Sequence, residues 1–150
     1  KDYSELFEKE IFLIKPNEHE AKMLTWIEVK NFEDAEKSAQ KFFEKWIKNV
    51  LITAWINWAY FFKSWNNLEN NFKKHYKIPD LKEVKNSELN LDIKDETWCW
   101  DQTMATLCSF LSKWYDIEKA IEIAILSWTL QFHKAWIWEI KIWDIEKYFW

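Results

Sequence analysis

Residues 95–101 read Asp-Glu-Thr-Trp-Cys-Trp-Asp and stand directly before an apolar segment that begins at Gln102. The polar stretch followed by apolar residues at helical spacing predicts a turn that opens a helix over residues 102–113. Such a turn directs several backbone N–H groups at one point, and the helix dipole adds positive potential there. The segment therefore predicts an anion-binding helix N-terminus, in which Trp98 and Trp100 occupy places that suit small residues.

The chain contains 13 tryptophans and no glycine, whereas average usage would give about ten glycines in a chain of this length. Several tryptophans follow helix-like segments or flank a strand end, where positive φ or close approach of the backbone favours glycine. These are Trp26, Trp46, Trp55, Trp58 and Trp114. Our hypothesis is that many or all tryptophan positions are glycine positions, most simply through a UGA codon that the source reads as glycine. A deliberate set of substitutions and a genuinely tryptophan-rich protein are the alternatives.

Composition limits the class of protein. The length of 150 residues suits one domain or part of a larger one. All 21 cations are lysines, spread among 25 acidic residues with a net charge of −4, which argues against a nucleic-acid partner. No apolar stretch is long enough to cross a membrane, and Cys99 and Cys108 have no metal-ligand spacing, so we expect a cytoplasmic protein with reduced thiols. Because the chain begins at Lys1, we expect its start not to be the native one.

Apolar runs and helical spacing alternate along the chain. Strands are predicted at 11–14, 49–54 and 59–63, with further candidates at 75–78, 89–93 and 136–142. Helices are predicted at 18–25, 32–45, 102–113, 117–132 and 144–149. This alternation favours a layered α/β fold.

With glycine at 98 and 100, residues 95–101 become D-E-T-G-C-G-D, which resembles the signature D-T-x-G-A-G-D of the PfkB/ribokinase family of carbohydrate kinases. The resemblance implies that the backbone at Trp98, Cys99 and Trp100 forms an anion hole for the transferring phosphoryl group. It also implies that Asp101 is the catalytic base. The alternative is a helix N-cap, for which Asp is a preferred residue. Glu96 departs from the commoner threonine.

The segment Lys15-Pro-Asn-Glu-His-Glu20 follows a predicted strand. In this family an Asn and a Glu at this spacing lie near magnesium and the phosphates, so the resemblance makes Asn17 and Glu20 candidates for positioning Mg²⁺. An amide and a carboxylate suit a hard cation that keeps most of its water. The alternative is a helix N-cap at Asn17 with a capping-box Glu20.

Residues 53–58, Thr-Ala-Trp-Ile-Asn-Trp, follow the strand predicted at 49–54. With glycine at 55 and 58 they resemble the family's T-x-G-x-x-G, which implies that Thr53, Trp55 and Trp58 support the nucleotide. A tight hairpin would need the same residues. His133 is a further candidate for lining the nucleotide pocket.

The resemblance covers nearly the whole chain but only the C-terminal half of a family member. It implies that residues 1–150 are part of a ribokinase-like domain, which is a mainly parallel sheet with helices on both faces. The domain would use ATP and Mg²⁺. A homodimer is the candidate assembly. Segments at Lys1–Ser4, Thr103–Leu107 and Phe132–Glu139 resemble the heptose-7-phosphate kinase domains of ADP-heptose synthesis enzymes. The function implied is phosphoryl transfer from ATP to a hydroxyl of a sugar or sugar phosphate.

Other functions remain open at this point. Another acceptor, such as ribose, fructose or a nucleoside, would fit the same motifs. A tryptophan-rich carbohydrate-binding module is the non-catalytic alternative. Read literally, indoles at 98 and 100 fill the space that a phosphate needs, so the chain as written is expected to be inactive.

Overall fold

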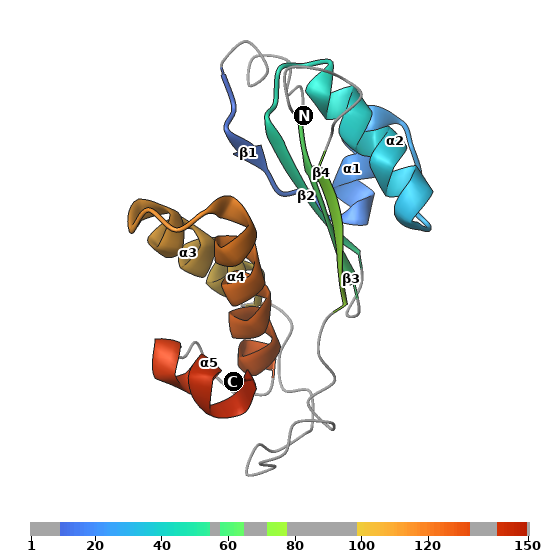
Figure 1. Ribbon diagram of the computed structural model, residues 1–150. Coiled ribbons are helices and arrows are strands. Elements are labelled where there is room, and N and C mark those ends of the chain that lie inside the picture. The colour runs from blue at the N-terminus through green and yellow to red at the C-terminus, as the bar shows by residue number, and fades with distance from the viewer. Residues whose placement is uncertain (1–9, 55–57, 65–71, 78–98, 133–140, 150) are drawn as a thin grey trace. The chain divides into compact units, whose positions relative to one another are not determined.

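The computed structural model describes residues 10–54, 58–64, 72–77, 99–132 and 141–149, which form parts of two compact units, 1–77 and 78–150 (Figure 1). The first contains β1 (Leu13–Ile14), α1 (Glu18–Thr25), α2 (Phe32–Phe43), β2 (Asn49–Ala54), β3 (Trp58–Lys63) and β4 (Phe72–Lys77). The second contains α3 (Cys99–Ser112), α4 (Ile117–Phe132) and α5 (Ile142–Phe149).

The first unit is built on a sheet with the strand order β1-β2-β3-β4. β1 pairs with β2 in parallel, with Leu13 opposite Asn49, whereas β2–β3 and β3–β4 are antiparallel. Helices in the chain between β1 and β2 allow that parallel crossover. Only three residues connect β2 to β3, and so short a connection requires an antiparallel hairpin. The α/β class is confirmed, but the expected mainly parallel arrangement is wrong for the described strands, which form a mixed sheet.

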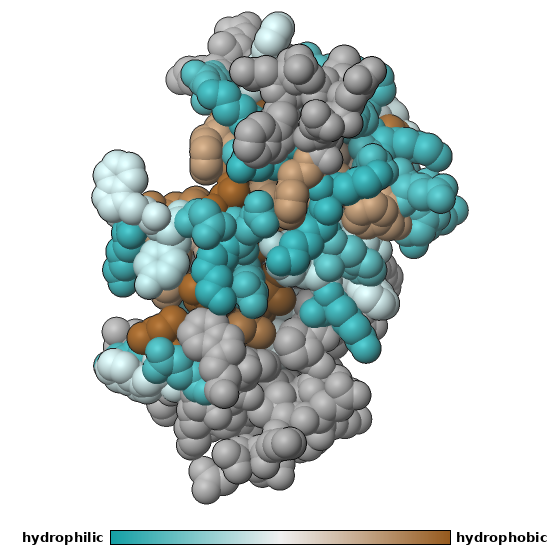
Figure 2. Space-filling model, in the orientation of Figure 1, coloured by the Kyte–Doolittle hydropathy of each residue, from teal (hydrophilic) through white to brown (hydrophobic). Residues whose placement is uncertain are grey.

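Helices α1 and α2 lie on one face of this sheet (Figure 1). Along α2 the small residues Ala35 and Ala39 and the large Phe42 are fully buried, because i, i+4, i+7 spacing places them on one side of the helix. The opposite side, at Glu33 and Lys37, is exposed, and hydrophilic side chains cover this surface (Figure 2). The core between helices and sheet contains Ala21, Val29, Ala35, Ala39, Phe42, Ile47, Val50, Ile52, Ala54, Tyr60 and Phe62.

The second unit contains helices in its described part. A connection of four residues joins α3 to α4, and the two helices pack along each other as a hairpin. Leu107 on α3 and Ile121 on α4 are fully buried. α5 contacts α4, and its Ile145 is buried.

The predicted elements agree closely with the structure. The bounds of α1, β2 and α4 are those expected, and β4 and α5 overlap their predicted ranges. α3 begins at Cys99 rather than Gln102, because the first turn of a helix needs no preceding hydrogen-bond acceptors and accommodates polar residues. Ile142 is helical and not part of a strand. The strand candidate at 89–93 lies outside the described residues.

The helix ends reveal three tryptophans in the left-handed region. Trp26, Trp46 and Trp114 have φ of 64°, 64° and 65°, as expected for positions that favour glycine. Trp58 and Trp100 are not among the positive-φ residues of the described chain, because Trp58 belongs to β3 and Trp100 to α3. Positive φ is therefore not the reason for glycine at these two positions, and close approach of the backbone stays a prediction there.

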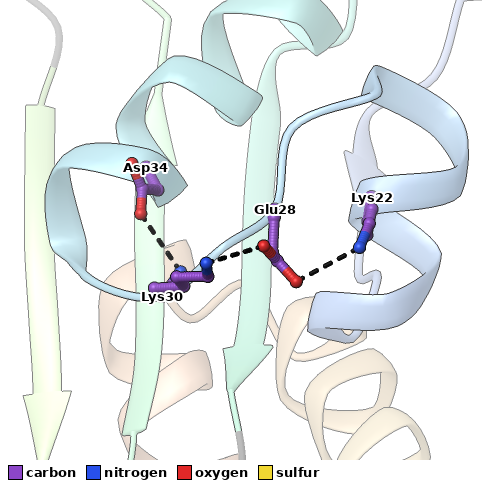
Figure 3. A network of polar contacts seen from close by, with 4 residues as sticks. All are labelled: Lys22, Glu28, Lys30 and Asp34. Atoms are coloured by element: carbon purple, nitrogen blue, oxygen red, sulfur yellow. Dashed lines mark hydrogen bonds and ion pairs between the residues drawn. The ribbon is translucent and has the colours of Figure 1, made fainter.

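A chain of charged side chains connects α1 to α2 (Figure 3). Glu28, between the helices, pairs with Lys22 of α1 at 3.1 Å and with Lys30 at 2.8 Å. The carboxylate of Asp34 in α2 accepts a hydrogen bond from the backbone N–H of Lys30 at 3.3 Å. The side-chain hydrogen bond from Lys30, followed by that from Lys22, lowers the pKa of Glu28 below its usual value.

We expect the Glu28→Gln variant to be less stable than the parent near neutral pH, and this difference to vanish in acid. A carboxyl whose pKa is lowered in the folded state contributes its stability above its unfolded-state pKa and loses it as the pH falls through the folded-state pKa. Urea unfolding of both proteins across this range measures the difference. Glu33→Gln, an exposed carboxylate outside the network, is the control. A difference that persists below the lowered pKa would contradict the ion pairing.

Candidate functional site

The carboxyl ends of β1 and β2 bring together two segments that the sequence placed in different motifs. Beyond β1, Asn17 forms an isolated parallel bridge with Thr53 at the end of β2. The backbone N–H of Thr53 donates to the carbonyl of Pro16 at 3.0 Å, and its hydroxyl approaches the same oxygen at 3.4 Å. The candidate metal-positioning segment and the candidate nucleotide segment therefore share one edge of the sheet, where open α/β sheets bind ligands.

Asn17 and Glu20 form a capping box at the start of α1. The side-chain oxygen of Asn17 accepts from the backbone N–H of Glu20 at 2.8 Å, and a Glu20 carboxylate oxygen accepts from the backbone N–H of Asn17 at 2.9 Å. The capping alternative raised from the sequence is thus present. It orients an amide and an exposed carboxylate at the same helix end.

Thr53 is 5% exposed and serves to hold β2 against the segment that follows β1. The candidates beside it differ in what the structure describes. Trp58 opens β3 opposite Ala54 and is 36% exposed, whereas Trp55 lies outside the described residues.

Asp101 occupies the first turn of α3 and is exposed. Cys99 and Trp100 begin the same helix, so their backbone N–H groups are among those that have no acceptor within the helix. Trp98 and His133 lie outside the described residues. Asp101 belongs to the second unit, whereas Asn17 and Thr53 belong to the first.

A polar cluster next to Asp101 was not expected from the sequence. The amide nitrogen of Gln102 donates to the hydroxyl of Thr106 at 3.1 Å and to that of Ser127 on α4 at 2.9 Å. The Thr106 hydroxyl in turn lies 3.0 Å from that of Ser127. Helical spacing places Thr106 one turn after Gln102, but the pairing with Ser127 depends on how two helices pack.

An aromatic group on β3 and β4 was also missed. The ring of His75 lies 4.6 Å from that of Trp58 and 4.8 Å from that of Tyr60, measured between centroids. Burial lowers the pKa of His75. Burial, followed by the charge of Glu18 on α1, raises the pKa of Tyr60. His75 lies in β4, within the strand candidate at 75–78, and its side chain is exposed.

The donor set at α1 limits how a cation would be held. Among the described residues, no group of three or more His, Cys, Asp or Glu side chains is arranged to hold a metal ion. Asn17 and Glu20 supply two kinds of oxygen donor, and the capping box engages one oxygen of each. This set fits Mg²⁺, which keeps several of its waters and takes few protein ligands.

Comparison with known proteins gives the fold. No protein-family model matches the chain. Ribokinase from Arabidopsis thaliana, solved with ribose and ATP, is 17% identical with a TM-score of 0.67, over 92% of this chain and 38% of that chain. The fold is ribokinase-like. Phosphofructokinase-2 from Escherichia coli, solved with substrates and products, is 15% identical with a TM-score of 0.61, over 83% of this chain and 36% of that one.

The range of similar structures extends beyond sugar kinases. Pyridoxal kinase from Entamoeba histolytica is 27% identical with a TM-score of 0.59, over 79% of this chain and 40% of that one. The chain thus spans about two fifths of the length of these structures. These neighbours are named as kinases, and a carbohydrate-binding β-sandwich is not the fold of the described residues. Within the described part of the chain, no helix is both long and apolar enough to cross a membrane.

We expect Asn17→Ala to lower the free energy of unfolding by about 1 kcal/mol, because it removes the N-cap of α1. Asn17→Ser is the matched variant, since serine caps helices about as well and should keep nearly all of the stability. Urea unfolding of the three proteins measures both effects. Equal losses for alanine and serine would show that the amide does more than cap the helix.

Proposed function

We propose that this chain is part of an ATP-dependent kinase that phosphorylates a hydroxyl group of a sugar or sugar phosphate. The observation that carries the proposal is the position of the signature-like segment 95–101. In a fold shared with ribokinase and phosphofructokinase-2, this segment leads into the N-terminus of α3, and Asp101 lies in the first turn of that helix.

The reaction follows from those groups. The oxygen of the acceptor hydroxyl attacks the γ-phosphorus of ATP and forms the new P–O bond, while the bond to the β–γ bridging oxygen breaks and ADP leaves. Asp101 takes the proton of the attacking hydroxyl. The backbone N–H groups at residues 98–100, helped by the positive end of the helix dipole, stabilise the charge that develops on the phosphoryl oxygens.

Within the first unit, we propose the edge formed by Asn17, Glu20 and Thr53 as a binding site for Mg²⁺ and the nucleotide. Mg²⁺ bound there would supply positive charge to the phosphates. Asn17 and Glu20 would hold the ion through its water shell, and Thr53 together with the connection from β2 to β3 would support the nucleotide. The joint position of Asn17 and Thr53 at one sheet edge supports this assignment.

The acceptor that we propose first is heptose 7-phosphate. The support is sequence resemblance at residues 1–4, 103–107 and 132–139. The solved neighbours include proteins named for ribose, fructose phosphate and pyridoxal chemistry, so these acceptors form the panel against which heptose 7-phosphate is compared.

In the complete protein with glycine at positions 98 and 100, we expect Asp101→Asn to lower kcat by about 10²–10⁴-fold, the range for loss of a general base. Coupled detection of ADP formation measures turnover. Asp116→Asn is the control, because Asp116 is another exposed aspartate that accepts the backbone N–H of Lys119 at the start of α4, a role that asparagine can fill. Unchanged turnover in Asp101→Asn would remove Asp101 from the role of base.

We expect the complete protein with tryptophan at all 13 positions to show no phosphoryl transfer. Two indoles beside the helix N-terminus would occupy the space of the phosphate. Replacing Trp98 and Trp100 with glycine should restore transfer, as followed by the same ADP assay. Glycine at Trp26, Trp46 and Trp114 alone should not restore it. Transfer by the all-tryptophan protein would contradict this prediction.

The Asn17→Ser variant separates the cap from the proposed cation site. Because serine keeps the cap but shortens the side chain, we expect stability to be retained while the Mg²⁺ concentration needed for half-maximal turnover rises several-fold. A titration of turnover with MgCl₂ measures this. An unchanged requirement for Mg²⁺ would remove Asn17 from the site.

A further inference from the structure

We propose that the natural protein carries glycine at positions 26, 46 and 114, and that one shared codon, read as glycine by the source, accounts for all 13 tryptophans in the sequence. This proposal does not depend on the kinase function. It rests on the backbone conformation at the ends of three helices and on the burial of the three side chains there.

The ends of α2 and α3 have the same hydrogen-bond pattern. At α2 the N–H of Trp46 donates to the carbonyl of Phe43 at 2.9 Å, and that of Ile47 donates to Phe42 at 3.3 Å. At α3 the N–H of Trp114 donates to Leu111 at 3.1 Å, and that of Tyr115 to Phe110 at 3.2 Å. These paired 5→2 and 6→1 bonds define the Schellman motif, whose left-handed residue is usually glycine.

The hydrophobic contact that accompanies a Schellman motif is present as well. In the α3 motif the residue after the left-handed position packs on the helix, because the rings of Tyr115 and Phe110 meet edge to face with centroids 5.0 Å apart. In the α2 motif the corresponding residues, Ile47 and Phe42, are both buried. The neighbours of Trp46 and Trp114 thus have the identities that the motif prefers. Only the left-handed residue itself, which is usually glycine, departs from that preference.

The end of α1 has the simpler left-handed cap. The N–H of Trp26 donates to the carbonyl of Lys22 at 2.8 Å, and Trp26 has φ 64° and ψ 16°. A 5→1 bond of this kind is the second common glycine-terminated ending. All the non-glycine residues with positive φ in the described part of the chain are therefore tryptophans at helix ends.

Burial of the indole side chains does not offset the energetic cost of the left-handed backbone conformation. Trp26, Trp46 and Trp114 are 91%, 84% and 95% exposed. In the left-handed conformation a Cβ lies too close to the following carbonyl, at a cost that only glycine avoids. In the described part of the chain these side chains bury almost no surface that would offset that cost, so it gives no physical reason for tryptophan at the three sites.

A shared codon extends the inference to positions where φ does not select glycine. Trp128 is 4% exposed inside α4, and Trp100 lies in the first turn of α3. If the cause is the codon, both are glycine too, together with Trp98. Glycine at 98 and 100 would leave the N-terminus of α3 open to a phosphate, and this last step rests on the proposed function.

Peptide mass spectrometry of the protein from its natural source tests the proposal. We expect peptides with the residue mass of glycine at 26, 46 and 114, and also at 128. We expect the sequenced gene to carry the same codon at each of these sites. Tryptophan at any of the three helix ends would overturn the inference. Glycine at those ends with tryptophan at 128 would overturn the shared cause.

Thermal unfolding of the complete protein tests the physical reason. Each of Trp26→Gly, Trp46→Gly and Trp114→Gly should raise Tm by about 2–4 °C. The matched alanine variants should gain little, because alanine retains the Cβ. An alanine variant that gains as much as glycine would show that removal of the indole, and not the backbone conformation, is the cause, which would overturn this reasoning.

A separate observation carries a second proposal, which rests on the proposed function. We propose that Gln102 is a positioning residue, which holds the first turn of α3, and therefore Asp101, against α4. Its amide nitrogen bonds two hydroxyls in the helix interface, Thr106 at 3.1 Å and Ser127 at 2.9 Å. Ser127 is fully buried and Thr106 is 9% exposed. Losing the hydrogen bond to Gln102 therefore costs free energy, because water does not readily replace the Gln102 amide at either hydroxyl.

A double-mutant cycle on turnover tests the role of Gln102. In the active complete protein, Gln102→Ala and Ser127→Ala should each lower kcat by about tenfold. The double variant should lose little more, because both substitutions remove the same hydrogen bond between Gln102 and Ser127. Ser109→Ala, at an exposed position on α3, is the control.

The outcomes of this cycle are distinct. Lower Tm with unchanged kcat, or independent losses that multiply, would overturn the positioning role while leaving the kinase function intact. If the parent protein itself transfers no phosphate to any acceptor in the panel, the proposed function fails, and the positioning role fails with it.

Discussion

The parallel pairing of β1 with β2 is the constraint on which the first unit depends. β1 has only two residues, yet the pairing continues past its end through the bond from Thr53 to Pro16 and the bridge between Asn17 and Thr53. This extension fixes where α1 begins, because Asn17 is both the last residue in register with β2 and the N-cap of the helix. A single short contact therefore aligns a helix N-terminus with the carboxyl end of the neighbouring strand.

The capping box also shows how one pair of side chains can have two roles. As a cap, Asn17 and Glu20 satisfy backbone N–H groups that the helix leaves unpaired. The same bonds hold an amide and a carboxylate at a sheet edge that suits a ligand. The structural interpretation therefore does not exclude the functional one. A cap of this kind holds its side chains in one geometry, which a binding residue requires.

Much of the local structure could be predicted because it depends on neighbours along the chain. The bounds of α1, β2 and α4 follow from apolar spacing, and the left-handed ends at Trp26, Trp46 and Trp114 follow from where that spacing stops. The start of α3 was placed too late, since the polar residues before Gln102 break the apolar pattern without breaking the helix. The expected mainly parallel sheet is wrong for β2 and β3. These two strands form an antiparallel hairpin, which the short connection between them already required.

The sequence by itself determined the α/β class, the helix ends that favour glycine and the residues that resemble a kinase signature, because each depends on residue types at short spacing. Only the tertiary structure decided that Asn17 and Thr53 meet, that Gln102 reaches Ser127 and that the His75 ring packs at a tilt against Trp58 and Tyr60. These residue pairs are brought together by strand register and helix packing. Both are settled by burial of apolar surface over the whole unit, which no short segment encodes.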